Sequence, residues 1–151
     1  MGKVRPEINA MLPFFGAAIV VGVLLMALAF AAKPEEPKAE SSFIREVEEH
    51  EFEAAVVGTS RHTPVILDFW ASWCGPCRIL GPRLESAVLA QQGKVLLAKL
   101  DLDLCPALAE RFEVQAVPTI IFMKNGQEVE RFSGVRAEPE LHRMIARFLV
   151  S

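Results

Sequence analysis

The chain is 151 residues long, with 52% hydrophobic and 23% charged side chains, a composition that excludes an intrinsically disordered protein. Its net charge of −3 excludes the basic character expected of a nucleic-acid-binding domain. Three cysteines are too few for a disulfide-rich secreted scaffold.

The first predicted element is an uncharged apolar run over residues 12–32, which follows a short tail at residues 1–11. As a helix this run would span about 30 Å, the thickness of the hydrocarbon core of a bilayer. We therefore predict one N-terminal transmembrane anchor, or an uncleaved signal-anchor. A cleaved signal peptide is the alternative, because Ala29, Phe30 and Ala31 match the small-x-small cleavage pattern.

A Pro- and Glu-rich segment over residues 33–42 is predicted to be a flexible, solvated linker. Lys3 and Arg5 before the anchor favour a cytoplasmic N-terminus, which would place the following domain on the periplasmic or extracytoplasmic side. Lys33 and Lys38 after the anchor nearly balance this signal, so the cytoplasmic face remains the alternative.

The remaining residues, 43–151, are predicted to form one α/β domain. Apolar runs rich in β-forming residues predict strands, and apolar residues at helical spacing predict helices. The predicted strands cover residues 65–70, 95–102, 119–123 and 127–132, and the predicted helices cover residues 77–92, 106–112 and 141–149. The dipeptide at residues 125–126 is Asn-Gly, which predicts a hairpin, and residues 43–57 are expected to hold one strand and one helix. This order predicts a mixed central β-sheet flanked by helices.

The strongest chemical signal is Trp73-Cys74-Gly75-Pro76-Cys77, which follows a buried strand and opens a helix. Two intervening residues on the first helical turn bring the sulfurs close enough for a reversible disulfide. Cys74 is expected to be exposed at the positive end of the helix dipole, which lowers its pKa and makes it the nucleophile. Cys77, one turn further, is expected to be shielded and to act as the resolving thiol.

Cys74 and Cys77 have two alternative roles. They could supply two of the four ligands of a zinc site, or they could form a permanent structural disulfide. His50, His62 and His142 are isolated, and a second ligand pair at zinc spacing is missing from the sequence. A static bridge at a strand–helix junction, beside an aromatic side chain, would be unusual. We therefore predict redox chemistry that uses no cofactor and no metal.

Residues 43–149 resemble a thioredoxin without large insertions. The matching blocks are VILDFWASWCGPCR at residues 65–78, AKLD at residues 98–101, AVPT at residues 116–119 and KNG at residues 124–126. The resemblance implies a thioredoxin fold and a thiol–disulfide oxidoreductase. Because the Gly-Pro dipeptide is that of reducing thioredoxins, it also implies reduction of protein disulfides.

The resemblance assigns roles to residues outside the cysteine motif. Asp68 matches the family's buried carboxylate beneath Cys77, where it would accept the proton of that thiol, and burial is expected to raise its pKa. Lys99 matches the lysine that partners this carboxylate. Pro118 matches the family's cis-proline, which faces the disulfide. The implied substrate-binding residues are Trp73, Gly75, Pro76, Val117, Pro118 and Gly134.

The third thiol, Cys105, precedes Pro106 at the start of a predicted short helix. This position can lower the pKa of a thiol, which would suit a redox sensor or a glutathionylation site. The alternative is an inert, partly buried thiol.

The predicted partners are disulfide-containing substrate proteins and an electron donor. A cytoplasmic domain would use a thioredoxin reductase, whereas an exported domain would need a transmembrane thiol donor. An exported thiol oxidase or isomerase and a non-catalytic partner-binding module are the alternative functions.

Overall fold

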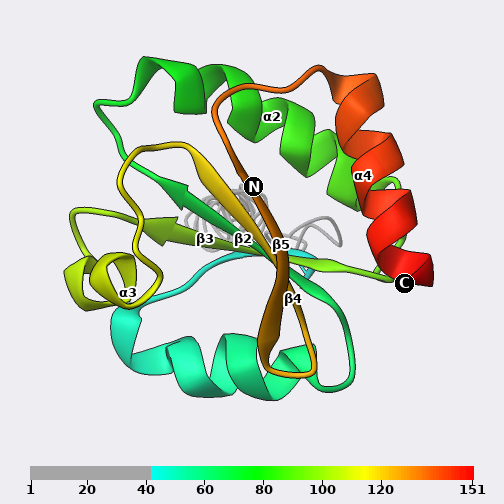
Figure 1. The fold of residues 1–151 in the computed structure, drawn as a ribbon, viewed down its shortest axis with the longest axis horizontal. Coiled ribbons are helices and arrows are strands. Elements are labelled where there is room, and N and C mark those ends of the chain that lie inside the picture. Colours follow the sequence, from blue (N-terminus) through cyan, green and yellow to red (C-terminus); the bar gives the residue numbers. More distant parts are fainter. Residues whose placement is uncertain (1–41) are drawn as a thin grey trace, which may run out of the picture. The chain divides into compact units, whose positions relative to one another are not determined.

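A computed structural model describes residues 42–151 (Figure 1). The predicted tail at residues 1–11, the predicted anchor at residues 12–32 and the predicted linker up to residue 41 lie outside the described residues. Among the helices that the structure does describe, none is long and apolar enough to cross a membrane.

The described residues contain one mixed sheet of five strands in the order β1-β3-β2-β4-β5. The strands are β1 (Ile44–Glu46), β2 (Val65–Trp70), β3 (Leu96–Asp101), β4 (Thr119–Lys124) and β5 (Gln127–Ser133). The first three strands in this order run parallel, whereas β4 is antiparallel to both β2 and β5. The mixed sheet predicted from the sequence is therefore present, and β1 and β5 form its edges.

The hairpin between β4 and β5 turns at the predicted Asn-Gly dipeptide. Asn125 and Gly126 both have positive φ angles, 54° and 77°, which this type of tight turn requires. The backbone N–H groups of Asn125 and Gly126 donate to the carbonyl and hydroxyl oxygens of Ser60, at 2.8 and 2.9 Å. The register shifts between Phe122 and Met123, so the edge strand carries an irregularity.

Helices cover both faces of the sheet (Figure 1). One face packs against α2 (Gly75–Leu89) and α4 (Glu138–Val150). The other face packs against η3 (Glu53–Gly58) and α3 (Pro106–Arg111), while η2 (Glu49–Glu51) precedes η3 and has no buried residue. The helix expected within residues 43–57 is thus a 3-10 turn followed by a π-helical segment.

Strand alternation places one carboxylate in the core. Along β2, Ile66 belongs to the cluster beneath α2 and α4, while Leu67 and Phe69 belong to the opposite cluster. Asp68 therefore projects toward α2, as Ile66 does. Its neighbour across the parallel pair with β3 is Lys99, which shares this face.

Candidate active site

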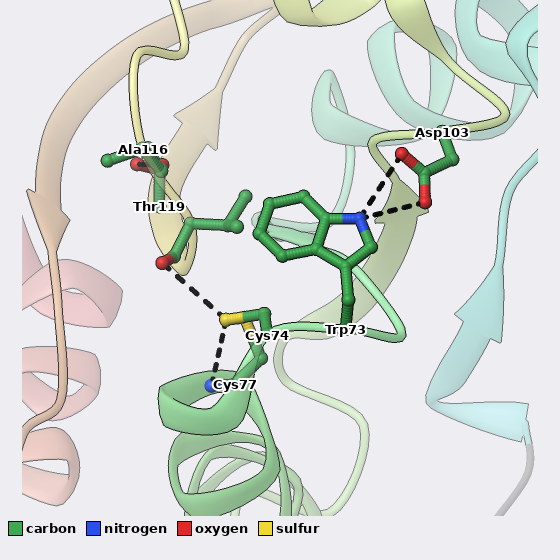
Figure 2. The surroundings of a disulfide bond; sticks show 7 residues. Trp73, Cys74, Cys77, Asp103, Ala116 and Thr119 are labelled. Atoms are coloured by element: carbon green, nitrogen blue, oxygen red, sulfur yellow. Dashed lines mark hydrogen bonds between the residues drawn. A yellow bond between two sulfur atoms is a disulfide. The ribbon is translucent and has the colours of Figure 1, made fainter.

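Cys74 and Cys77 form a disulfide at the N-terminus of α2, with their Cα atoms 5.3 Å apart. Cys74 is the N-cap residue of this helix, and its sulfur accepts a hydrogen bond of 3.1 Å from the backbone N–H of Cys77 (Figure 2). This N–H is one of the amides that a helix leaves unpaired in its first turn. The same contact would stabilise negative charge on the Cys74 sulfur after reduction.

The expected difference in exposure between the two cysteines is wrong. Cys74 is 4% exposed and Cys77 is 7% exposed, so both are nearly buried. The sulfur of Cys74 lies 3.5 Å from the carbonyl oxygen of Val117, and Ala71 and Leu102 pack in the same small cluster. The loop before β4 therefore covers a sulfur that the sequence alone placed at an open helix end.

Asp68 is 3% exposed, and its Oδ1 atom is buried without a hydrogen-bond partner in the described structure. Burial raises the pKa of this carboxyl from 3.8 to about 6, and the negative charge of Glu85 adds to the rise while Lys99 opposes it. Asp68 and Cys77 line a common cavity of about 280 Å³. The cavity is large enough for several water molecules, which could carry a proton between the two groups.

Lys99 does not form an ion pair with Asp68, contrary to the expected pairing. Its ammonium lies 2.8 Å from Oε1 of Glu85 on α2, and 5.4 Å from the centre of the Trp70 ring. The lysine is 20% exposed and the glutamate 34% exposed, so this ion pair lies between the cavity and solvent. Cross-strand register brings Lys99 beside Asp68, but the helix supplies the carboxylate that holds its ammonium.

The residues expected to bind substrate gather around the disulfide. Trp73 is 63% exposed, and its indole N–H donates to Oδ2 of Asp103 at 3.0 Å (Figure 2). The Val117–Pro118 peptide bond is cis. The backbone N–H of Gly134 donates to the carbonyl oxygen of Pro118 at 3.0 Å, which brings two distant segments of the chain together.

The first two residues of α2 complete the expected set. Gly75 and Pro76 lie between the two cysteines, and Pro76 occupies the first helical turn, where its missing N–H costs no helical hydrogen bond. The six residues expected to bind substrate therefore come from the segment that leads into α2 and its first turn, the loop before β4 and the loop after β5.

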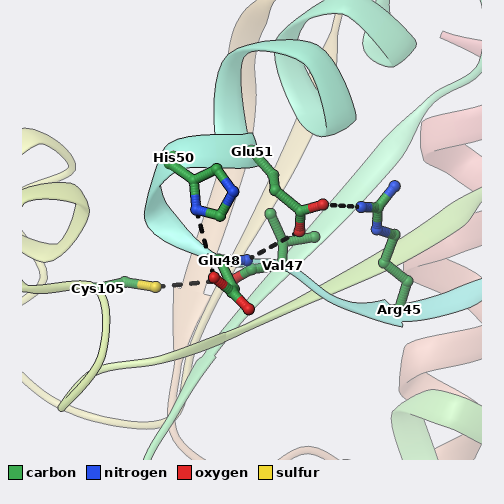
Figure 3. A network of polar contacts seen from close by, with 6 residues as sticks. All are labelled: Arg45, Val47, Glu48, His50, Glu51 and Cys105. Atoms are coloured by element: carbon green, nitrogen blue, oxygen red, sulfur yellow. Dashed lines mark hydrogen bonds and ion pairs between the residues drawn. The ribbon is translucent and has the colours of Figure 1, made fainter.

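Cys105 is the N-cap residue of α3, but its environment differs from that of the active-site pair. Its side chain makes no capping hydrogen bond, and its sulfur lies 3.7 Å from the carbonyl oxygen of Val47 (Figure 3). Burial raises the pKa of the thiol, and the nearby charges of Glu49 and Asp101 raise it further. The lowered pKa considered from the sequence is wrong, and the inert buried thiol describes Cys105 better.

Two residues of the site have no counterpart among those predicted. Glu85 holds Lys99, and Asp103 holds the Trp73 indole. Glu85 stands two helical turns after Cys77, a spacing that places it near the cysteines without revealing its partner. Within residues 42–151, the structure contains no group of three or more histidine, cysteine or acidic residues arranged to hold a metal ion.

Sequence comparison identifies the family behind this geometry. The family model named Thioredoxin matches residues 43–147. The chain belongs to the thioredoxin family. The match covers all five strands and the cysteine pair at the start of α2, and it confirms the resemblance and the fold inferred from the sequence blocks.

Individual relatives agree with the family assignment. The chain is 48% identical over 99 residues to a protein of Bos taurus named "Thioredoxin, mitochondrial", covering 66% of this chain and 58% of the relative. It is 48% identical over 88 residues to "Probable thioredoxin-2" of Caenorhabditis elegans, covering 58% and 61%. It is 40% identical over 98 residues to "Bifunctional thioredoxin reductase/thioredoxin" of Mycobacterium leprae, covering 65% and 21%. The chain thus spans less than two thirds of the length of each of these relatives.

Proposed function

We propose that this thioredoxin-family chain is a thiol–disulfide oxidoreductase that reduces disulfides in other proteins. The observation that carries the proposal is the Cys74–Cys77 disulfide at the N-terminus of α2, with the Cys77 amide aimed at the Cys74 sulfur. An amide in this position favours the thiolate over the thiol, and the thiolate is the reactive form in disulfide exchange.

In the first step, the reduced Cys74 thiolate attacks one sulfur of a substrate disulfide. A bond forms between Cys74 and that sulfur, and the substrate's own S–S bond breaks. The departing substrate sulfur leaves as a thiolate and takes a proton from water. The product of this step is a mixed disulfide between Cys74 and the substrate.

In the second step, Cys77 resolves the mixed disulfide. Asp68 accepts the Cys77 proton through the shared cavity, and the resulting thiolate attacks the Cys74 sulfur. The Cys74–Cys77 bond forms and the second substrate sulfur leaves as a thiolate, so two electrons pass from the protein dithiol to the substrate. A carboxyl with a pKa of about 6 is ionised at neutral pH and is a stronger base than an ordinary aspartate.

Substrate would bind across the loops beside the disulfide. Trp73 offers an exposed apolar surface, which the hydrogen bond to Asp103 holds in one orientation. The carbonyl of Val117, next to Pro118, lies within 3.5 Å of the Cys74 sulfur and so borders the place where a substrate sulfur must approach. These groups fit an extended segment of a disulfide-containing protein better than a small molecule.

Trapping the mixed disulfide tests this function. In a Cys77→Ser variant the second step is blocked, so a substrate protein should remain covalently attached through Cys74 and be released by dithiothreitol. A Cys74→Ser variant is the matched control and should trap nothing. Equal trapping by both variants would overturn the assignment of Cys74 as the nucleophile.

The electron donor is proposed to be a thioredoxin reductase or a transmembrane thiol donor. The Mycobacterium leprae relative supports the first type, because its name joins a thioredoxin reductase to a thioredoxin in one protein. Reduction of the Cys74–Cys77 disulfide by a purified thioredoxin reductase and NADPH would support this donor. Failure with several such reductases would favour the transmembrane thiol donor.

The apolar run at residues 12–32 supports a further proposal, that the domain is anchored to a membrane and faces its extracytoplasmic side. Labelling of Cys74 in intact cells with a membrane-impermeant maleimide tests it, with Cys74→Ser as the control. Labelling without reductant would support an exported, reduced domain. Labelling only after an impermeant reductant would support an exported oxidase, and labelling only after permeabilisation would place the domain inside the membrane barrier.

A further inference from the structure

The cavity beneath the disulfide contains an ion pair that the two-step mechanism does not use. The polar and titratable side chains that line it are those of Asp68, Ser72, Cys77, Arg78, Glu85 and Lys99. Asp68 and Cys77 exchange a proton in the proposed reaction. Lys99 and Glu85 bind one another across the same space, 2.8 Å apart.

The register of the sheet makes Lys99 the natural partner of Asp68. The two residues are directly paired on β2 and β3, and both side chains project to the face that α2 covers. Two opposite charges so placed would ordinarily form an ion pair. In the structure, however, Oδ1 of Asp68 is buried without a hydrogen-bond partner, and the Lys99 ammonium contacts Glu85 instead.

The ammonium of Lys99 is held by two groups. Oε1 of Glu85 accepts its hydrogen bond, and the face of the Trp70 ring lies 5.4 Å away. Glu85 is fixed by α2, the helix that also carries Cys77 at its first turn. The helix that presents the resolving thiol therefore also supplies the carboxylate that holds the lysine.

We propose that Glu85 is a positioning residue for disulfide exchange: it holds the Lys99 ammonium away from the Asp68 carboxylate and so keeps that carboxylate free to take the proton of Cys77. This inference rests on the proposed function, because Asp68 matters as a base only if Cys77 resolves a mixed disulfide. Without Glu85, the Lys99 side chain would turn to Asp68, its register partner on β2, and neutralise that carboxylate.

The charges around Asp68 give this exchange a definite direction. Lys99 lowers the pKa of Asp68, whereas Glu85 raises it. Arg78 on α2 is exposed, and the antiparallel neighbour of Asp68 on β4 is the apolar residue Ile120. Removal of the Glu85 charge should therefore lower the pKa of Asp68 by two effects. The repulsion from Glu85 disappears, and the released Lys99 ammonium can approach Asp68.

The test is a titration of the Asp68 carboxyl by NMR in the oxidised full-length chain, with ¹³C-labelled aspartate and a neutral detergent. In Glu85→Gln, the midpoint should fall from about 6 by roughly one pH unit or more. Glu130→Gln is the matched control, because Glu130 is 33% exposed and also binds a cationic side chain, that of Arg147. The Asp68 midpoint in Glu130→Gln should equal that of the unchanged protein. In Glu85→Asp, which keeps the negative charge, the midpoint should lie close to that of the unchanged protein. An unmoved midpoint in Glu85→Gln would overturn the inference.

A double variant shows whether Glu85 acts through Lys99. In Lys99→Gln alone, the Asp68 midpoint should rise, because the attractive positive charge is gone. Adding Glu85→Gln to Lys99→Gln should then change the midpoint by less than half of the change that Glu85→Gln causes alone. Equal changes in both backgrounds would mean that Glu85 acts on Asp68 directly, and the positioning role would be wrong.

Kinetics separate this inference from the proposed function. The release of substrate from the Cys74 mixed disulfide should show an acidic limb set by Asp68. In Glu85→Gln this limb should move to lower pH, and the plateau should fall several-fold because the base is weaker. A lower rate at every pH with an unmoved limb would contradict the positioning role. A chain that never forms the mixed disulfide would refute the proposed function, while the NMR midpoints would still report on Glu85.

Discussion

The two helices that follow the parallel strands β2 and β3 begin in the same way, but only the first carries a disulfide. Both α2 and α3 have a cysteine as N-cap residue and a proline in the first turn. The Cys74 sulfur accepts a hydrogen bond of 3.1 Å from the backbone N–H of Cys77, whereas the Cys105 sulfur faces the carbonyl oxygen of Val47. A helix N-terminus therefore does not activate a thiol unless the sulfur turns toward the free amides.

The local backbone and the surrounding charges explain the difference. Cys74 has φ −81° and ψ 106°, an extended N-cap conformation that directs its side chain back over the first turn. Cys105 has φ −124° and ψ 53°, and its side chain packs into the hydrophobic cluster beside η3. The carboxylates near Cys105, those of Glu49 and Asp101 among them, favour its neutral thiol and oppose the helix dipole.

The largest expected difference between the two cysteines is in activity. Cys74→Ala should lower the rate of insulin-disulfide reduction by at least about 1000-fold, because no other sulfur can form the mixed disulfide. Cys105→Ala should change this rate less than twofold. Comparable losses in the two variants, with unchanged circular dichroism, would break the distinction between the two helix starts.

The next difference should appear in alkylation of the fully reduced protein. With iodoacetamide at pH 7, Cys74 should react about 100-fold faster than Cys105, because the Cys77 amide favours the Cys74 thiolate whereas burial raises the pKa of the Cys105 thiol. Peptide mapping by mass spectrometry after short exposures gives both rates in one sample. Similar rates would show that Cys105 is reached by frequent local opening.

A third prediction concerns the buried carboxyl of Asp68, which shares a cavity with Cys77. The pKa of Asp68 is 3.8 when exposed and about 6 in the fold, so the folded state retains a proton that the unfolded state has lost. Stability therefore falls as pH rises from about 4 to 6, and above this range the buried charge costs about 3 kcal/mol.

The variant Asp68→Asn removes this cost. At pH 7, its free energy of unfolding measured in urea should be about 2–3 kcal/mol higher than that of the unchanged protein. This gain in stability should vanish near pH 4. The variant should also slow the release of substrate from the mixed disulfide. A gain in stability that is the same at both pH values would point to a cause other than the buried charge.

The smallest expected effect is on the stability contributed by Cys105. Its side chain is buried in an apolar cluster, so Cys105→Ala should cost about 1 kcal/mol through lost packing. Cys105→Ser should cost more, because the hydroxyl must be desolvated and the acceptor beside it, the carbonyl of Val47, lies 3.7 Å from the present sulfur. A serine variant as stable as the unchanged protein would mean that this sulfur is less enclosed than the structure indicates.

Much of the fold was predictable because its signals are local. The apolar run of β2, the spacing of apolar residues along α2 and the Asn125-Gly126 turn each depend on a few neighbouring residues. The cysteine pair was predictable for the same reason, since its geometry is set by two intervening residues in one helical turn. The 3-10 and π-helical segments after β1 were not, because their form depends on packing against the sheet.

The errors concern contacts between distant parts of the chain. Burial of Cys74 depends on the position of Val117, 43 residues later. The partner of Lys99 is either Asp68 of β2 or Glu85 of α2, and the sequence alone does not show that the Glu85 carboxylate lies above β3. The sequence showed that Cys105 precedes a proline at a helix start. It did not show that acidic residues such as Glu49 of η2 would lie beside the thiol in the fold.

The two edges of the sheet bear on how the molecule behaves at high concentration. An exposed strand edge can pair with the edge of a second molecule and begin aggregation. Here β1 is three residues long, and β5 carries Glu128, Glu130 and Arg131 beside a register shift. Such edges resist edge-to-edge assembly, so the sheet is expected to remain unpaired with other copies at high concentration.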